Sequence, residues 1–138
     1  MSVPRSELIA AADRSPRATV AHDRAEWVGL FTADGRVEDP VGSRPHVGPL
    51  QIGRFYDTFI EPRRIAFHYD ADIVCGSTVV RDVVLEVGMG PTVTMRIPAV
   101  LRYDMQAVAD EWRIERLRAF LDAIAASDEL ARAGSSAH

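Results

Sequence analysis

The chain has 138 residues, of which 47% are hydrophobic and 26% charged, with a formal net charge of -4. This composition is typical of a globular protein, so we take residues 1–138 as one α+β domain whose ends, about 1–4 and 133–138, are frayed. Acidic and basic residues are mixed along the chain, which argues against nucleic acid or a membrane surface as partner. No apolar run is long enough for a signal peptide or a membrane span. We therefore expect a cytoplasmic protein.

The first half of the chain predicts three helices, over residues 6–13, 24–31 and 49–60. Ser6 is a candidate N-cap for the first, and Pro16 either kinks that helix or restarts it. Asp23 caps the second helix, and Gly35 supplies its left-handed stop. Two short strands around a turn follow within residues 36–47.

The second half predicts four long strands, over residues 64–74, 77–88, 91–104 and 111–121, and a short closing helix over 122–134. Arg81 alternates with valines on one face of the second long strand. Pro98 inside the third implies a sheet edge or a bulge. Helices grouped on one face of such a curved sheet give an α+β domain. The sheet is expected to be cone-shaped and to enclose an apolar cavity.

An acidic pair, Glu38 and Asp39, stands directly before Pro40. Adjacent strand residues face opposite sides, so only one carboxylate of the pair can face the cavity, and the other is solvated. We expect Glu38 to be the exposed one. A carboxylate at an apolar wall has a raised pKa and is a better base, whereas a carboxylate that only caps a turn is held low by backbone N–H groups.

Metal and cofactor sites are not indicated. The four histidines, His22, His46, His68 and His138, show no ligand spacing, and no glycine-rich phosphate loop is present. The lone Cys75 cannot form an internal disulfide, and its strand-like surroundings are typical of a small core residue. We expect no metal and no cofactor.

Four stretches together resemble the ketosteroid isomerase branch of the nuclear transport factor 2-like (SnoaL-like) superfamily. They are "FTADGRVEDPVG" at 31–42, "LQIGRFY" at 50–56 and, more loosely, "IPAVLRYD" at 97–104 and "WRIERLRAF" at 112–120. The resemblance implies a cone-shaped fold, an apolar pocket for a steroid-like or polycyclic molecule, and a homodimer formed through the sheet. It also implies that Asp39 is the general base that moves a proton between carbons of the substrate.

The same resemblance implies that the oxyanion-binding residues are missing. The family's tyrosine falls at Ser15, its protonated aspartic acid at Ala99 and a supporting tyrosine at Phe31, while Tyr56 is retained. Loss of oxyanion donors costs about 10²–10³ in rate for each donor, so activity is expected to be weak or altered. Candidates for replacing the donors are Ser15, Tyr56, His68 and Tyr69. The residues expected to line the pocket are Ser15, Phe31, Phe55, Tyr56, Met95, Ile97, Ala99 and Phe120.

Three functions remain open at this point. The first is an isomerase-like or cyclase-like enzyme that acts on an apolar ligand with Asp39 as base. The second is a small-molecule binding protein without catalysis, and the third is a dimeric interaction module of the same fold. The run "RYD" at 102–104 is similar to the Arg-x-Asp of epoxide hydrolases with this fold, but no partner aspartate is identifiable.

Overall fold

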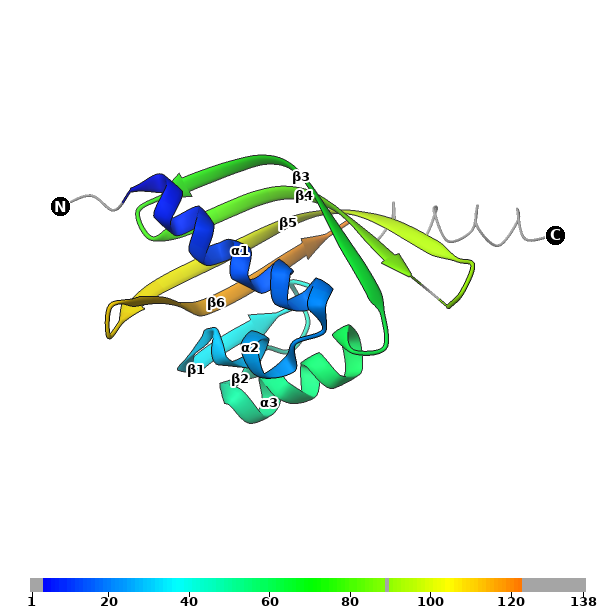
Figure 1. Ribbon diagram of the computed structural model, residues 1–138, viewed down its shortest axis with the longest axis horizontal. Coiled ribbons are helices and arrows are strands. Elements are labelled where there is room, and N and C mark those ends of the chain that lie inside the picture. The colour runs from blue at the N-terminus through cyan, green and yellow to red at the C-terminus, as the bar shows by residue number, and fades with distance from the viewer. Residues whose placement is uncertain (1–3, 89, 123–138) are drawn as a thin grey trace.

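The structure is a computed structural model that describes residues 4–88 and 90–122. It confirms the predicted α+β class, with helices followed by a curved sheet (Figure 1). In chain order the elements are α1 (Arg5–Ala21), α2 (Arg24–Gly29), β1 (Phe31–Glu38), β2 (His46–Val47), α3 (Gly48–Phe55), the π-helical turn η1 (Tyr56–Ile60), β3 (Arg64–Cys75), β4 (Thr78–Gly88), β5 (Thr94–Val108) and β6 (Glu111–Leu121). The predicted closing helix lies outside the described residues, apart from its first residue, Asp122.

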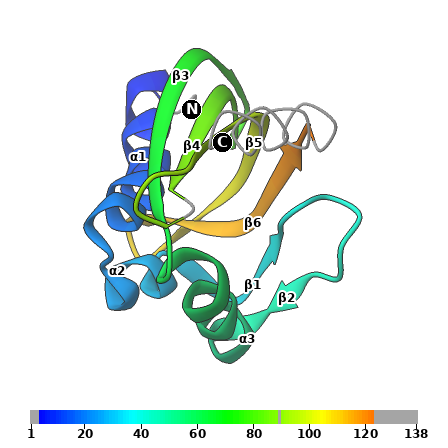
Figure 2. The ribbon, with the colours of Figure 1, turned by 90° about the vertical axis from the view of Figure 1, so that its right-hand side faces the viewer.

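The sheet has the strand order β2-β1-β6-β5-β4-β3 and is mixed. β1 and β6 run parallel, and every other neighbouring pair is antiparallel. Seen along the sheet in Figure 2, the strands curl around α1, while α2 and α3 lie together at the β1 end. The concave face of this open sheet therefore faces α1.

The first helix is longer than the sequence predicted. It begins at Arg5 after Pro4, without a side-chain cap from Ser6, and it passes through Pro16 without a break. His22 ends it in the left-handed conformation, and its N–H donates to the carbonyls of Ala18 and Thr19. Pro16 is buried, so packing against the rest of the protein offsets the hydrogen bond that proline removes from the helix.

The second helix is capped as predicted but ends early. The Asp23 side chain accepts a hydrogen bond from the Glu26 N–H at 3.1 Å. Gly35 does not stop this helix, which ends at Gly29, and the following residues form β1. The reason is pairing with a segment distant in sequence. The Leu30 carbonyl accepts a hydrogen bond from the Ile114 N–H of β6 at 2.8 Å, so the residues after Gly29 join the sheet instead of continuing the helix.

Along β5 the side chains alternate strictly between the two faces. Ile97 and Ala99 are buried on the concave face, and Val100 is exposed on the convex face. Pro98 lies in an interior strand rather than on an edge strand, paired with β4. The Pro98 carbonyl accepts a hydrogen bond from the N–H of Asp122, the residue just after β6. Proline has no backbone N–H to donate, and at Pro98 this lack falls where the neighbouring strand β6 has already ended.

The core extends from α1, α2 and α3 to β1, β4, β5 and β6, and an aromatic cluster lies within it. Its centre is Trp27, whose ring lies 5.1 Å from that of Phe31, 5.9 Å from that of Phe55 and 5.7 Å from that of Tyr56. All four side chains are buried. Cys75, predicted as a core residue, is instead a free and exposed thiol at the end of β3.

Replacing Gly35 should test how tightly the backbone of β1 bends on itself and packs against β6. A Cβ at this position would stand 2.9 Å from the Phe31 Cβ and 3.2 Å from the Ile114 carbonyl oxygen. We expect Gly35→Ala to lower the free energy of unfolding by about 1–3 kcal/mol, measured by urea denaturation. Gly29→Ala is the matched control, because no atom lies within 4 Å of its Cβ position. Equal stabilities of the two variants would contradict this picture of β1.

Candidate functional site

The acidic pair at the end of β1 is divided between the two faces of the sheet. Glu38 faces the convex side, where the Arg118 Nε donates to its Oε1 at 2.9 Å. It is therefore half-buried and ion-paired rather than solvated, which corrects the sequence expectation. Asp39 is half-buried and follows the last residue of β1, a strand in which Val37 is fully buried. The peptide bond between Asp39 and Pro40 is cis.

The Asp39 carboxyl lies in surroundings that disfavour its charge. The residue is half-buried, and burial raises its pKa to about 6. This is the direction expected for a carboxyl at an apolar wall, and the opposite of the direction for one held by backbone N–H groups. At neutral pH most of the carboxyl is ionised, yet it binds a proton more readily than an ordinary aspartate does.

A buried phenol from β5 interacts electrostatically with this carboxyl. Tyr103 is 1% exposed, and both Arg81 and Asp39 contribute to its electrostatic surroundings. Ser15 of α1, 3% exposed, makes a side-chain hydrogen bond with it. Burial raises the pKa of Tyr103 to about 12, while Ser15 and Arg81 act in the opposite direction. The phenol therefore stays protonated at neutral pH.

Sequence reasoning missed Tyr103, although a signal was available. The alternation that places Ile97, Ala99 and Leu101 on the concave face continues to Tyr103 two residues later. The "RYD" run had instead drawn attention to Arg102 and Asp104. These two residues pair with each other at 3.2 Å on the convex side of β5.

The aromatic residues expected to line a pocket form closed core instead. Phe31, Phe55 and Tyr56 pack around Trp27 and are at most 7% exposed. The Tyr56 hydroxyl is buried and has no hydrogen-bond partner among the described residues. Burial raises the pKa of Tyr56 to about 12, so this side chain is a neutral phenol within the core.

The predicted sheet residues fall on both faces. Met95, Ile97 and Ala99 lie on the concave face, with Met95 only half-buried. Phe120 does not line a cavity: it pairs with Val100 on the convex face, is 39% exposed and lies under the Arg118 guanidinium, 5.1 Å from its ring centre. His68, a candidate donor, also lies on the convex side, 3.3 Å from Glu86.

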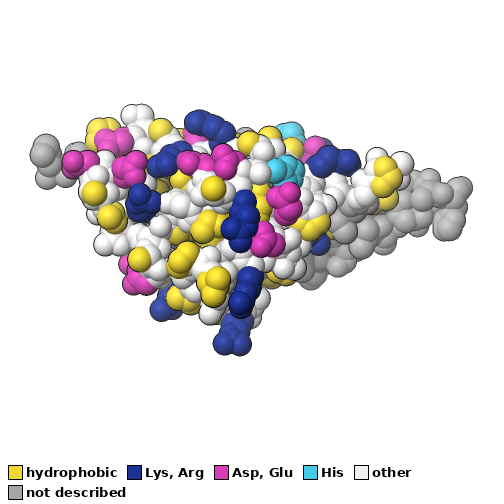
Figure 3. Space-filling model, turned by 60° about the horizontal axis from the view of Figure 1, so that its bottom comes forward, with side chains coloured by type: hydrophobic (Ala, Val, Ile, Leu, Met, Phe, Trp, Pro, Cys, Tyr) yellow, Lys and Arg dark blue, Asp and Glu magenta, His cyan; other side chains and the backbone are white. Residues whose placement is uncertain are grey.

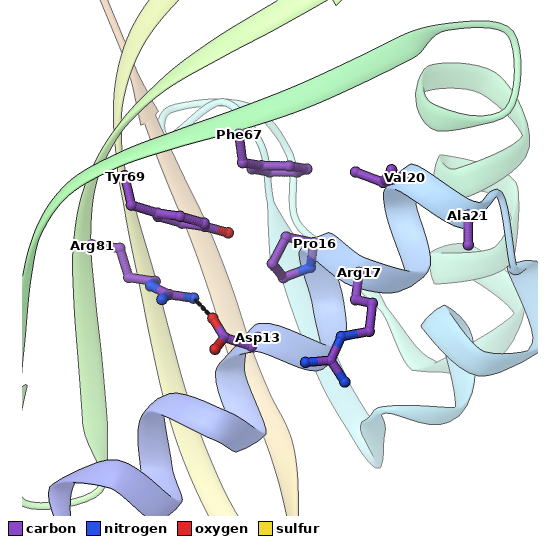
Figure 4. A pocket seen from close by; sticks show the side chains of 8 residues that line it. All are labelled: Asp13, Pro16, Arg17, Val20, Ala21, Phe67, Tyr69 and Arg81. Atoms are coloured by element: carbon purple, nitrogen blue, oxygen red, sulfur yellow. Dashed lines mark hydrogen bonds and ion pairs between the residues drawn. The ribbon is translucent and has the colours of Figure 1, made fainter.

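A cleft of about 640 Å³ opens between α1 and the curled part of the sheet (Figure 4). On one side stand Phe67 and Tyr69 of β3, whose rings are nearly parallel, 11° apart. The opposite side is α1. The lining residues are Asp13, Pro16, Arg17, Val20, Ala21, Phe67, Tyr69 and Arg81. None of them is among the residues predicted to line the pocket, and of these only Tyr69 had been considered, as a candidate donor.

A buried ion-pair cluster closes one end of this cleft. The Arg81 side chain is 4% exposed, and its Nε donates to Asp72 Oδ1 at 2.9 Å. Its Nη1 donates to Asp13 Oδ1 at 2.5 Å, and the guanidinium lies 4.0 Å from the centre of the Tyr69 ring. Burial alone would lower the pKa of Arg81, but the hydrogen bonds to Asp72 and Asp13 outweigh it and the pKa is raised.

The sequence offered one signal for this cluster. Arg81 interrupts an apolar face that Val79 and Val83 continue, and a buried cation needs carboxylate partners. Its partners could not be chosen from the sequence, because Asp13 lies in a helix 68 residues away and Asp72 in a different strand.

Other kinds of site find little support in the part of the chain that the structure describes. No group of three or more histidine, cysteine or acidic side chains there could hold a metal ion. Within the same residues no helix is long and apolar enough to cross a membrane. On the face shown in Figure 3, basic and acidic side chains are interspersed among apolar ones, without a continuous stripe of one sign.

The chain is similar in fold to several solved structures. The Δ5-3-ketosteroid isomerase from Mycobacterium sp. is 26% identical, with a TM-score of 0.76, over 86% of this chain and 95% of that one. A Mycobacterium tuberculosis protein in complex with estradiol-17β-hemisuccinate is 24% identical, with a TM-score of 0.75, over the same shares. A protein from Shewanella denitrificans, described as a SnoaL-like polyketide cyclase, is 18% identical, with a TM-score of 0.81. The match covers 93% of this chain and 99% of that one.

No curated protein matches the chain. A family model does: that of the nuclear transport factor 2 (NTF2) domain, which covers residues 10–125 and so includes most of α1, the whole sheet, Asp39 and the cleft. The curved mixed sheet with helices at its concave side agrees with this match. The chain therefore belongs to the nuclear transport factor 2 domain family.

Proposed function

We propose that this protein acts on an apolar, steroid-like or polycyclic carbonyl compound and that Asp39 is its general base. The observation that carries the proposal is the Asp39 carboxyl, which faces inward with a pKa that burial raises to about 6. A base is most effective when its pKa lies near the working pH. The structural likeness to a ketosteroid isomerase supports this reading.

The proposed reaction is a proton transfer between carbons. The Asp39 carboxylate removes a proton from the carbon next to the carbonyl, and the electron pair moves onto the carbonyl oxygen to give a dienolate. The resulting carboxylic acid then returns the proton to a more distant carbon of the conjugated system. Base and substrate thus end with the atoms with which they began, and no cofactor is required.

The developing negative charge on the carbonyl oxygen needs a hydrogen-bond donor. Ala99 and Phe31 cannot donate, and the Tyr56 hydroxyl is enclosed in the core. The nearest group of the same kind is the Tyr103 phenol with its Ser15 partner, which stands on β5 four residues beyond Ala99, the position of the family's aspartic acid. Because this donor differs in position and is engaged by Ser15, we expect weak or altered activity.

A second candidate function is binding without catalysis. The observation that favours it is the cleft, whose lining includes neither Asp39 nor Tyr103. A molecule held there would contact aromatic rings and a satisfied ion-pair cluster but no base. An experiment can distinguish the two functions by measuring whether a bound ketosteroid is converted to product.

The pKa of Asp39 can be tested directly by NMR titration of its carboxyl carbon. We expect a midpoint near pH 6. Because the folded-state pKa is raised, this group's contribution to stability is present at low pH and is lost as the pH rises from about 4 to 6. Wild type should therefore lose stability relative to Asp39→Asn across that interval, by on the order of 2 kcal/mol. A midpoint below pH 4 would show that Asp39 only caps the turn.

Isomerisation of a 5-ene-3-ketosteroid, followed by ultraviolet absorbance of the conjugated product, tests the chemistry. Weak turnover is expected, rising with deprotonation of a group of pKa about 6. Asp39→Asn should abolish it, since a base contributes about 10²–10⁴-fold. Glu38→Gln, the neighbouring carboxylate on the convex face, should leave it intact. Combining Ser15→Tyr with Ala99→Asp should raise it. Activity unchanged in Asp39→Asn would assign the base to another residue.

We further propose a homodimer formed through the convex face of the sheet, in the cytoplasm, where the exposed thiol of Cys75 would stay reduced. Val100 and Phe120 lie on that face, 36% and 39% exposed. Sedimentation should give a dimer for wild type and a monomer for Val100→Glu. Leu50→Glu, a similar change at a 71% exposed position on α3, should remain dimeric. A wild-type monomer at micromolar concentration would rule the dimer out.

A further inference from the structure

The cleft between α1 and β3 has the shape of a slot. The Phe67 and Tyr69 rings, 6.2 Å apart and nearly parallel, form one wall. Pro16 and Val20 of α1 stand opposite them, as Figure 4 shows. Tyr69 is 39% and Val20 57% exposed, so apolar surface on both sides is open to solvent. Its volume of about 640 Å³ lies within the range of roughly 300–1,000 Å³ that small-molecule sites occupy.

The polar groups of the cleft gather at one end. Arg81 contacts Oδ1 of Asp13, and the Asp13 side chain, which lines the cleft, is 35% exposed, so its other oxygen can still accept a hydrogen bond. The Tyr69 hydroxyl points into the same space (Figure 4). Burial raises the pKa of Tyr69, so its hydroxyl keeps its proton and can donate. Asp13 and Tyr69 both contact Arg81, so an acceptor and a donor belong to the same end of an apolar slot.

The charges at this end balance. Arg81 and Arg17 carry two positive charges, and Asp13 together with Asp72, behind Arg81, carries two negative ones. The Arg81 guanidinium already donates hydrogen bonds to the carboxylates of Asp72 and Asp13, so few of its N–H groups are left to bind an anionic ligand. A ligand carbonyl could accept from Tyr69 but would place its lone pairs against Asp13. A hydroxyl group suits both partners, since it donates and accepts.

We propose that the cleft binds a flat, uncharged, mainly apolar molecule by its hydroxyl group, which donates to Asp13 and accepts from Tyr69. Arg81 is a positioning residue that holds the Asp13 carboxylate toward the cleft. The inference rests on the proposed function only in taking the cleft as the place of the small molecule. It does not require that Asp39 act on that molecule.

Three matched probes test the proposal: 2-naphthol, 2-methoxynaphthalene, which cannot donate, and 2-naphthoate, which is anionic. Dissociation constants come from NMR titration of the ¹⁵N-labelled full chain. We expect 2-naphthol to bind at least about tenfold more tightly than either other probe, the value of one hydrogen bond to a charged acceptor. Asp13→Asn should remove this preference, and Tyr69→Phe should reduce it. Asp57→Asn, which breaks the exposed Arg24–Asp57 ion pair, is the matched control and should change nothing.

Ala21→Trp keeps the proposal testable if Asp13→Asn does not fold. Ala21 is exposed at the end of α1, and an indole there should fill the slot and abolish binding of both neutral probes. Equal affinity for 2-naphthol and 2-methoxynaphthalene, tighter binding of 2-naphthoate, or undiminished binding to Ala21→Trp would overturn the proposal.

Asp39→Asn separates the two claims. It should leave the affinity for 2-naphthol unchanged, whereas loss of binding would place the probe at Asp39 and contradict the cleft. If the tenfold preference holds while no ketosteroid turns over, the proposed chemistry fails and the binding site stands.

Discussion

The buried guanidinium of Arg81 is the constraint on which the concave side of this protein depends. A cation removed from water is costly unless carboxylates surround it, and breaking such a buried pair costs roughly 3–5 kcal/mol. Asp72 of the neighbouring strand β3 accepts a bidentate pair of hydrogen bonds from Arg81, and Asp13 of α1 accepts a third. The cluster therefore fixes the position of α1 against β3 and β4. The ion pairs of Arg81 hold α1 beside β3 and β4. The cleft lies next to these ion pairs, where the apolar side chains of the helix and of the strands leave a space between them.

The charges of Arg81 and Asp39 differ in whether a partner of opposite charge offsets their burial. Arg81 is fully paired, which makes it inert toward ions and useful for orienting Asp13. The burial of Asp39 is not offset in this way, and its pKa is raised. Both charges act on the Tyr103 phenol, which also makes a side-chain hydrogen bond with Ser15.

The sequence predicted the fold class and most of the order of elements, because each follows from local spacing. Periodicity of 3.6 or 2 residues and a prolyl turn were enough. It failed where distant segments decide the outcome. Gly35 looked like a helix stop, but pairing with β6 makes it part of a strand. Phe120 looked like a lining residue, but the register of β6 against β5 turns it outward. The partners of Arg81 lie on two other elements, and no local pattern names them.

The parallel pairing of β1 with β6 also has a consequence for the order of assembly. β1 carries Asp39 at its end, yet its partners are the two-residue β2 and a strand that begins at Glu111. Contacts between segments so distant in sequence form late and slow the folding of a domain. During synthesis the chain up to the start of β6 would thus emerge with Asp39 exposed to water and the pKa of this carboxyl near that of a free aspartate. The environment that perturbs this carboxyl exists only once the last strand has closed against the first.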